Sequence, residues 1–238
     1  MKKKNYNIAI IGLGNIGSYL YSYLKKNKKQ LASKSNAIPN ILYVSAKNKK
    51  KKRSFSINKK MWLKSYLDAA KIKEIDLIVE LIGGAEGAAK KLVFSALKNG
   101  KHVVTANKAL ISKYGDQLSK IAEKNKVNLE FEAAVCGGVP IIRTIKEGLL
   151  ANRINKLYGI FNGTSNFILS SMESDKLSFK DSLLKAQKLG YAESNPTSDI
   201  NGQDVSSKLQ ILTSLSFNTL LDKSIYVEGI NNIDQIDI

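Results

Sequence analysis

The chain has 238 residues, 38 of them lysine or arginine and 20 aspartate or glutamate, so its formal net charge is +18. This length suffices for one large or two ordinary domains. No apolar run approaches the roughly 18 residues of a membrane span, and the N-terminus has no signal-peptide pattern. The single cysteine, Cys136, excludes an internal disulfide and fits a reducing compartment, so we expect a soluble, cytoplasmic protein.

The positive charge by itself suggests a polyanion as partner. Much of it, however, sits in runs at 2–4, 25–29 and 47–53, which lack the aromatic interleaving of a single-strand binder and the pattern of a helix-turn-helix reader. We interpret these runs mainly as solvated surface, and we expect no nucleic-acid partner and no membrane partner.

An apolar run at 7–11 leads into a glycine-rich turn, and a helical pattern follows at 18–26. The turn has GxGxxG spacing, in which the first glycine allows a tight turn, the second lets a pyrophosphate approach the backbone, and the third lets helix and strand pack closely. Backbone N–H groups at the helix start attract the phosphate charge. We therefore predict a dinucleotide site formed by Gly12, Leu13, Gly14, Asn15, Ile16 and Gly17.

A second strand is predicted at 40–46, and the residues directly after it bear on the choice of cofactor. An NAD-preferring site places an acidic residue at the tip of this strand, on the ribose hydroxyls. Here Lys47 and the cations at 49–53 occupy that region instead. Cations suit a 2′-phosphate, so the sequence favours NADP over NAD, with Lys47 as the candidate contact and the choice among these cations open.

Further strands are predicted at 75–81, 101–105 and 127–132, with helices between them at 85–98 and 109–123. This alternation predicts an α/β fold, a Rossmann-type doubly wound parallel sheet with right-handed crossovers. Ligands of such sheets bind at the carboxyl ends of the strands. That edge would hold the glycine-rich turn, Gly83 and Gly84, Thr105, Lys108 and Glu132. Thr105 and Lys108 then lie beside the nicotinamide half of the cofactor.

The pattern changes at Cys136, so we expect an NAD(P)-binding domain over 1–135 and an α+β substrate and dimerisation domain over 136–238. In the second domain we predict a helix through 150, a strand at 156–161, a helix through 172 capped by Asn162 or Thr164, and a helix at 179–189.

The stretch 190–208 brings three carboxylates and a lysine together. Glu193 and Asp199 lie in a predicted loop, and a helix is expected to begin near 201–202. On that helix Asp204 and Lys208 are four residues apart, so they share one face and can pair. Spacing alone favours the simpler interpretation, a loop followed by a surface helix with one ion pair.

These motifs resemble those of the homoserine dehydrogenase family over nearly the whole chain. The matching segments are GLGNIG at 12–17, VELIGG at 79–84, GKHVVTANKA at 100–109, FEAAVCGGVPII at 131–142, GIFNGTSNFIL at 159–169 and GYAESNPTSDINGQDVSSKL at 190–209. The resemblance implies reversible NAD(P)-dependent oxidation of L-homoserine to L-aspartate 4-semialdehyde, in the biosynthesis of threonine, methionine and isoleucine, by a homodimer.

The resemblance also implies roles for individual residues. Lys208 would be the catalytic lysine, supported by Asp204, and Lys108 a second lysine that contacts cofactor and substrate. Glu193 would hold the substrate ammonium with Asp199 in support, and Thr164 and Tyr191 would line the amino-acid pocket. A monovalent cation, usually sodium, would be bound by Glu132 and the backbone carbonyls of Val135, Gly137 and Val139.

The chemistry of a lysine fits this assignment. An unperturbed amine with a pKa of about 10.4 is an acid for reduction, and it becomes a base only when burial or another cation lowers that pKa. We hypothesise that Lys108 and Lys208 lower each other's pKa while Asp204 orients Lys208.

Two features depart from the family. Asn195 stands where an acidic residue is common, and the chain ends at Ile238, whereas family members continue. A piece of a longer protein and a shortened enzyme are both open at this point. So are two other functions: another Rossmann oxidoreductase such as an aspartate dehydrogenase, and a non-catalytic module that binds a nucleotide or nucleic acid.

Overall fold

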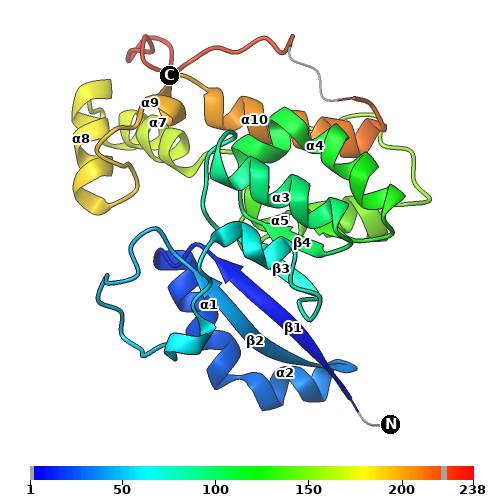
Figure 1. Cartoon of the computed structure of the whole chain (residues 1–238). Helices are drawn as coiled ribbons and strands as arrows, with labels where there is room; N and C mark the ends of the chain where they lie inside the picture. The colour runs from blue at the N-terminus through cyan, green and yellow to red at the C-terminus, as the bar shows by residue number, and fades with distance from the viewer. Residues whose placement is uncertain (1–2, 221–223) are drawn as a thin grey trace. The chain divides into compact units, whose positions relative to one another are not determined.

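The computed structural model describes residues 3–220 and 224–238. The chain forms two compact units, Met1–Pro140 and Ile141–Ile238 (Figure 1), which divide five residues beyond the boundary expected after Val135. Within the described ranges, no helix combines the length and the apolar character that a membrane crossing requires.

The first unit is built on a parallel sheet of five strands among its described residues, in the order β2-β1-β3-β4-β5. The strands are β1 (Lys4–Ile11), β2 (Ala37–Ser45), β3 (Leu77–Glu80), β4 (His102–Thr105) and β5 (Leu129–Glu130). Every pairing is parallel. The strand order reverses between β1 and β3, which confirms the doubly wound prediction and places a crevice at the carboxyl ends of these two strands.

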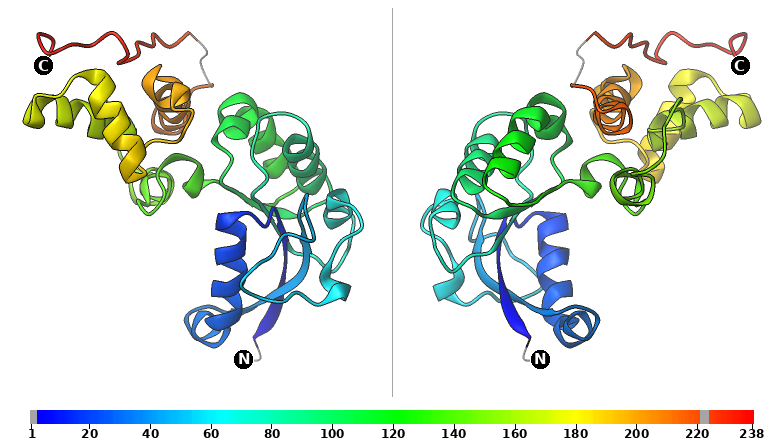
Figure 2. Two further views of the ribbon diagram at one scale, coloured as in Figure 1. Left: turned by 90° about the vertical axis from the view of Figure 1, so that its left-hand side faces the viewer. Right: turned by 90° about the vertical axis from the view of Figure 1, so that its right-hand side faces the viewer.

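The strands are connected by the helices α1 (Asn15–Lys26), α2 (Lys28–Lys34), α3 (Ala88–Lys98) and α4 (Lys108–Lys124), with short 3-10 turns η1 (Lys59–Met61) and η2 (Tyr66–Ala70). Of these helices, α1, α3 and α4 contribute buried residues to the core. Figure 2 shows α1 on one face of the sheet and α3 on the other. On the α1 face, Tyr21 is fully buried and belongs to the same core as Ile10 of β1 and Val44 of β2. This burial fixes α1, and therefore the glycine-rich turn before it, against the strands.

Two details of the first unit differ from the prediction. Helix α2 was not predicted, because it has no buried residue and therefore no apolar periodicity to reveal it. The strand predicted at 127–132 is shorter in the structure. Strand β5 has two residues, and they pair with Val103 and Val104 of β4. Glu132 consequently begins a short helix, α5 (Glu132–Val135), instead of ending a strand.

The described part of the second unit consists of helices and irregular segments. Its helices are α6 (Ile141–Arg143), the π-helix η3 (Thr144–Gly148), α7 (Gly163–Asp175), α8 (Phe179–Leu189), α9 (Thr197–Ile200) and α10 (Gln203–Phe217). Ile168 and Met172 of α7 form its core with Ala186 of α8. The chain after α10 returns to this core, because the Ile230 backbone N–H donates to the Ile200 carbonyl at 2.8 Å.

The strand predicted at 156–161 is wrong: no strand is assigned to these residues. Their alternating pattern fits a strand, and Tyr158 and Ile160 are 83% and 77% exposed. A strand needs a neighbouring strand to accept and donate its backbone hydrogen bonds, and the described part of this unit contains none.

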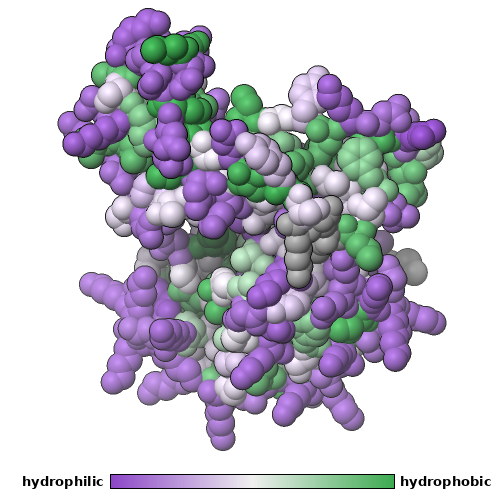
Figure 3. Space-filling model, turned by 90° about the horizontal axis from the view of Figure 1, so that it is seen from above, coloured by the Kyte–Doolittle hydropathy of each residue, from purple (hydrophilic) through white to green (hydrophobic). Residues whose placement is uncertain are grey.

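The lysine runs lie at the surface, as interpreted from the sequence. Lys25, Lys26 and residues 49–52 are exposed. On the face shown in Figure 3, hydrophilic side chains project around the rim, with hydrophobic patches between them.

Candidate functional site

The glycine-rich turn lies between the end of β1 and the start of α1. Gly12 has a φ of +107°, and a Cβ there would lie 2.3 Å from the Leu81 carbonyl oxygen. A Cβ on Gly17 would lie 1.9 Å from the Gly12 carbonyl oxygen, whereas one on Gly14 would meet nothing within 4 Å. The first and third glycines are therefore required by packing. The second leaves the start of α1, which has no side-chain cap, open to an approaching anion.

A cavity of about 730 Å³ opens at this turn, at the carboxyl ends of β1, β2 and β3. Its lining combines the turn with the cationic loop after β2 and with the end of β3, and includes Gly12, Gly14, Ser45, Lys47, Lys49, Lys51, Arg53 and Leu81. This is the place and the size expected of a dinucleotide crevice.

The structure distinguishes the cations of this loop by their contacts, which the sequence could not do. Arg53 donates to the carbonyls of Asn48 at 3.0 Å and Lys51 at 2.9 Å, and its Nη2 lies 3.5 Å from the Leu13 carbonyl oxygen. Arg53 thus ties the cationic loop to the glycine-rich turn. Lys47 and Lys49 are both exposed and line the cavity, and Lys49 also donates to the Leu63 carbonyl at 2.8 Å.

At this edge of the sheet lies a ring of hydrogen-bonded polar groups centred on the buried Glu80 side chain, which we call the Glu80 ring. The Glu80 carboxylate, with no exposed surface, accepts from the backbone N–H groups of Ile82 at 2.6 Å and Gly83 at 3.2 Å, and from the Thr105 hydroxyl at 2.5 Å. The Thr105 hydroxyl accepts in turn from the Asn107 N–H at 3.0 Å. The ring therefore joins the loop after β3 to the loop after β4.

Thr105 and Lys108 occupy different places in this arrangement. Thr105 is fully buried and its hydroxyl donates to Glu80, and the cofactor contact expected of this residue stays a prediction. Lys108 is partly exposed and is the first residue of α4. It directly follows Asn107, so the ring fixes where its backbone begins.

The residues predicted to bind a cation lie in and after α5. Glu132 and Val135 are the ends of that helix, and Gly137 and Val139 belong to the turn in which the Val139 N–H donates to the Cys136 carbonyl at 3.2 Å. One carboxylate and three carbonyls are oxygen donors, which suit a hard cation. No group of three or more His, Cys, Asp or Glu side chains that could hold a metal occurs in residues 3–220 and 224–238.

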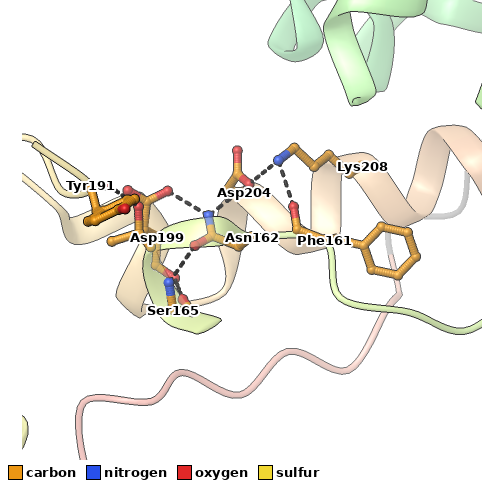
Figure 4. Close-up of polar contacts among 8 residues, drawn as sticks. Phe161, Asn162, Ser165, Tyr191, Asp199, Asp204 and Lys208 are labelled. Carbon is orange, nitrogen blue, oxygen red and sulfur yellow. Dashed lines mark hydrogen bonds and ion pairs between the residues drawn. The ribbon is translucent and has the colours of Figure 1, made fainter. Parts of the chain in front are cut away.

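In the second unit, Lys208 lies in a polar network with its predicted partner (Figure 4). Its Nζ is 2.8 Å from Asp204 Oδ2, and the two side chains are only 18% and 9% exposed. Nζ also donates to the Phe161 carbonyl at 2.7 Å. The predicted pairing on one face of α10 is confirmed, and limited exposure to solvent distinguishes it from an ordinary surface pair.

Asn162 joins this pair to Asp199, a role that the sequence did not reveal. Its Nδ2 donates to Asp199 Oδ1 at 2.8 Å and to Asp204 Oδ2 at 3.0 Å. Its Oδ1 accepts from the Ser165 N–H at 2.7 Å and so caps α7, as predicted. The residue type suggested a helix cap, but the two carboxylates come from 37 and 42 residues further along the chain, so no local pattern could have placed them there.

The remaining predicted substrate residues surround the loop after α8. The Thr164 hydroxyl donates to the Tyr191 carbonyl at 2.6 Å, and the Tyr191 ring stacks on Phe167 at 4.5 Å between centroids. Glu193 is exposed, and its backbone carbonyl accepts from the Gln187 amide at 3.1 Å. The loop is thus anchored by its backbone while the Glu193 side chain extends from it.

Each unit therefore gathers its own set of predicted residues. Lys108 belongs to the first unit and Lys208 to the second, so their convergence on one substrate, and the mutual effect on their pKa values, stay predictions.

Comparison with known proteins identifies the family. Residues 12–132 match the family model described as homoserine dehydrogenase, NAD binding domain, and residues 140–238 match that of homoserine dehydrogenase. Homoserine dehydrogenases of Neisseria gonorrhoeae and Pseudomonas aeruginosa are 42% and 43% identical over 99% of this chain, which spans 54% of each relative. The structure of a homoserine dehydrogenase from Thiobacillus denitrificans matches with a TM-score of 0.92 at 40% identity, covering 100% of this chain and 55% of that one. The chain belongs to the homoserine dehydrogenase family and spans about half the length of these relatives.

Proposed function

We propose that this protein interconverts L-homoserine and L-aspartate 4-semialdehyde with NADP as the preferred cofactor. The observation that carries the proposal is the Lys208–Asp204 pair, a shielded lysine 2.8 Å from its carboxylate in a unit that also presents Glu193. The dinucleotide crevice of the first unit and the membership of the chain in the family support the same reaction.

Lys208 has the chemistry that this reaction needs. When bound, NADPH supplies the hydride that reduces the aldehyde carbon. Lys208 gives a proton to the aldehyde oxygen in that direction and takes it back when the alcohol is oxidised. Asp204 and the Phe161 carbonyl hold Nζ in place by accepting hydrogen bonds from it. A fixed Nζ favours the reaction because proton transfer requires the donor within hydrogen-bond reach of the substrate oxygen.

The other predicted residues bind the two ends of the substrate and the cofactor. Glu193, with Asp199 in support, attracts the substrate ammonium by charge. Thr164 of α7 and Tyr191 in the loop after α8 shape the amino-acid pocket. Lys108 begins α4 at the cofactor edge of the sheet and contacts both ligands. Replacing Glu193 by Asp should raise the KM for homoserine more than it lowers turnover.

The preference for NADP is supported by the cations around the crevice. Lys47 is exposed at its lining, and Arg53 holds the loop that carries it. Replacing Lys47 by Ala should raise the KM for NADPH about tenfold, the effect of losing one charge-assisted contact, with little change for NADH. Equal effects on both cofactors would argue against a contact with the 2′-phosphate.

A sodium ion bound by Glu132 and the carbonyls of Val135, Gly137 and Val139 would join the end of α5 to the turn after it. The oxygen donors fit such a cation. If the site is used, exchanging sodium for choline should lower the thermal stability of the wild-type chain but not that of a Glu132→Gln variant.

The central test measures NADPH consumption with L-aspartate 4-semialdehyde and NADP reduction with L-homoserine. Replacing Lys208 by Ala should lower kcat by about 100-fold or more and leave the KM for NADPH nearly unchanged. Lys185→Ala is a matched control, because Lys185 also pairs with an aspartate, Asp175, at 2.6 Å, but at the surface of the same unit. Unchanged turnover in Lys208→Ala would refute the assignment.

The oligomeric state and the alternative functions can be tested with the same preparation. We propose a homodimer, as the family resemblance implies, and sedimentation velocity would measure its mass. We also propose that it acts in the cytoplasm, because its single cysteine fits a reducing compartment. Activity with aspartate but not homoserine would favour an aspartate dehydrogenase, and a salt-dependent shift with random DNA would favour a nucleic-acid-binding module.

A further inference from the structure

We propose that Asn162 is a positioning residue that holds Asp199 and Asp204 side by side as carboxylates, and so fixes Lys208 for proton transfer. The inference rests on the proposed function, because it assumes that Lys208 is the residue that exchanges the proton.

The Asn162 amide lies between two negative charges. One nitrogen, Asn162 Nδ2, is 2.8 Å from an Asp199 oxygen and 3.0 Å from an Asp204 oxygen. Both carboxylate oxygens lie within hydrogen-bond distance of this one nitrogen, so their like charges repel each other across it. An amide NH₂ carries two hydrogens, one for each carboxylate, and it brings no charge of its own. Asn162 therefore offsets the repulsion without a second cation that would compete with Lys208.

The helix cap sets the orientation of this amide. The Ser165 N–H at 2.7 Å needs an acceptor, so the oxygen of the Asn162 amide must face the start of α7. The nitrogen is then turned toward the two carboxylates. With only 7% of its surface exposed, Asn162 is held in this orientation by its surroundings.

One carboxylate oxygen links Asn162 to the lysine. Asp204 Oδ2 accepts from Asn162 and is also the oxygen that pairs with Lys208 at 2.8 Å. The carboxylate that holds Nζ is therefore itself held by the amide. Figure 4 shows the sequence of contacts from Asp199 through Asn162 and Asp204 to Lys208. A displaced Asp204 would displace Nζ, and an error of about 1 Å in a reacting group can cost roughly 100-fold in rate.

The capping and donor roles of Asn162 can be separated by substitution, because asparagine, aspartate and serine are similarly good caps. Asn162→Asp retains the cap oxygen, loses the donor and adds a third carboxylate. Asn162→Ser retains a short cap but no longer spans the two aspartates. Ser178→Asn is a control that exchanges one good cap for another on α8, where the Ser178 hydroxyl accepts from the Asp181 N–H at 3.1 Å.

The experiment measures kcat, the KM for each substrate and the melting temperature of the full chain. We expect Asn162→Asp to lower kcat about 100-fold and Asn162→Ser about tenfold, with a raised KM for homoserine and an unchanged KM for NADPH. The melting temperature should stay close to wild type in Asn162→Ser and fall in Asn162→Asp, where a third carboxylate is buried beside two others. Ser178→Asn should match wild type throughout.

Each other outcome is decisive. Near-normal turnover in both Asn162 variants would overturn the inference, and so would loss of the folded state in both, since Asn162 would then act only as a cap. Wild type and Lys208→Ala are assayed in parallel. An inactive wild type would refute the proposed function, whereas an active wild type, an inactive Lys208→Ala and an active Asn162→Asp would refute this inference alone.

Discussion

The two units build their candidate sites from different material. The first presents mainly backbone: the glycine-rich turn, the open start of α1 and the loop after β3, supported from behind by the buried Glu80 ring. The second presents side chains, in the network that Asn162, Asp199, Asp204 and Lys208 form. A backbone surface can contact a large cofactor along its length. Ionisable side chains, in contrast, can exchange a proton with a small substrate.

In the candidate site of each unit, one asparagine side chain both caps a helix and donates to a second group. Asn107 caps α4 by accepting from the Leu110 N–H at 3.1 Å and donates to the Gly84 carbonyl at 2.7 Å. Asn162 caps α7 and donates to two carboxylates. In both cases the cap fixes the amide and leaves its nitrogen to position a second group. That group is a backbone loop in the first unit and a pair of charges in the second.

The largest expected effect tests whether the site of the first unit depends on the backbone conformation of its glycine-rich turn. Gly12→Ala places a Cβ 2.3 Å from the Leu81 carbonyl oxygen, at a φ of +107°, so β1 and β3 would have to separate. We expect a loss of about 3 kcal/mol or more in the free energy of unfolding, measured by urea denaturation. Gly14→Ala meets no atom within 4 Å and should weaken NADPH binding without lowering stability. Equal destabilisation by the two changes would contradict this account of the turn.

The same substitution in the two asparagines should give opposite kinetic results. Asn107→Asp keeps the cap of α4 but sets a carboxylate oxygen against the Gly84 carbonyl, so the loop after β3 should shift and the KM for NADPH should rise about tenfold, the effect of one lost hydrogen bond. Its kcat should fall less than that of Asn162→Asp, which should leave the KM for NADPH unchanged. Steady-state kinetics of the pair decide whether the two capping residues serve different ligands.

A smaller effect is expected from the buried ring. In Glu80→Gln, the amide oxygen can still accept from the Ile82 N–H, but the amide nitrogen then faces the Thr105 hydroxyl, which already accepts from the Asn107 N–H. The Thr105 hydroxyl hydrogen loses its acceptor, so stability should fall by about 1–3 kcal/mol. Thr105→Ser retains the hydroxyl and is the control. A stabilised Glu80→Gln protein would mean that desolvating the charge outweighs its hydrogen bonds.

The backbone site of the first unit was largely predictable from the sequence, and the side-chain site of the second unit was only partly so. The strands, the glycine-rich turn and the helix at 179–189 follow from local periodicity, which burial on a sheet or a helical core enforces. The pairing of Asp204 with Lys208 follows from helical spacing.

The features that could not be predicted depend on contacts distant along the chain. Asn162 meets carboxylates from α9 and α10, and Arg53 is singled out from a run of cations only by the carbonyls around it. The strand expected at 156–161 needs a neighbour that local pattern cannot supply.

The smallest expected effect concerns a surface cluster in which Glu86, just before α3, pairs with Lys90 of α3 and Lys113 of α4. Hydrogen bonds from Lys113 first, then Tyr114 and Lys90, lower the pKa of Glu86 from 4.5 to about 2. A carboxylate whose pKa falls on folding stabilises the fold above its unfolded pKa and loses that contribution as the pH drops through the folded value. Glu86→Gln should therefore lower the melting temperature slightly at pH 6, and its difference from wild type should shrink between pH 4.5 and about 2. Glu123→Gln, an exposed site on α4, removes the same charge and controls for the change in net charge. Because Glu86 is exposed, added salt should weaken the effect at every pH.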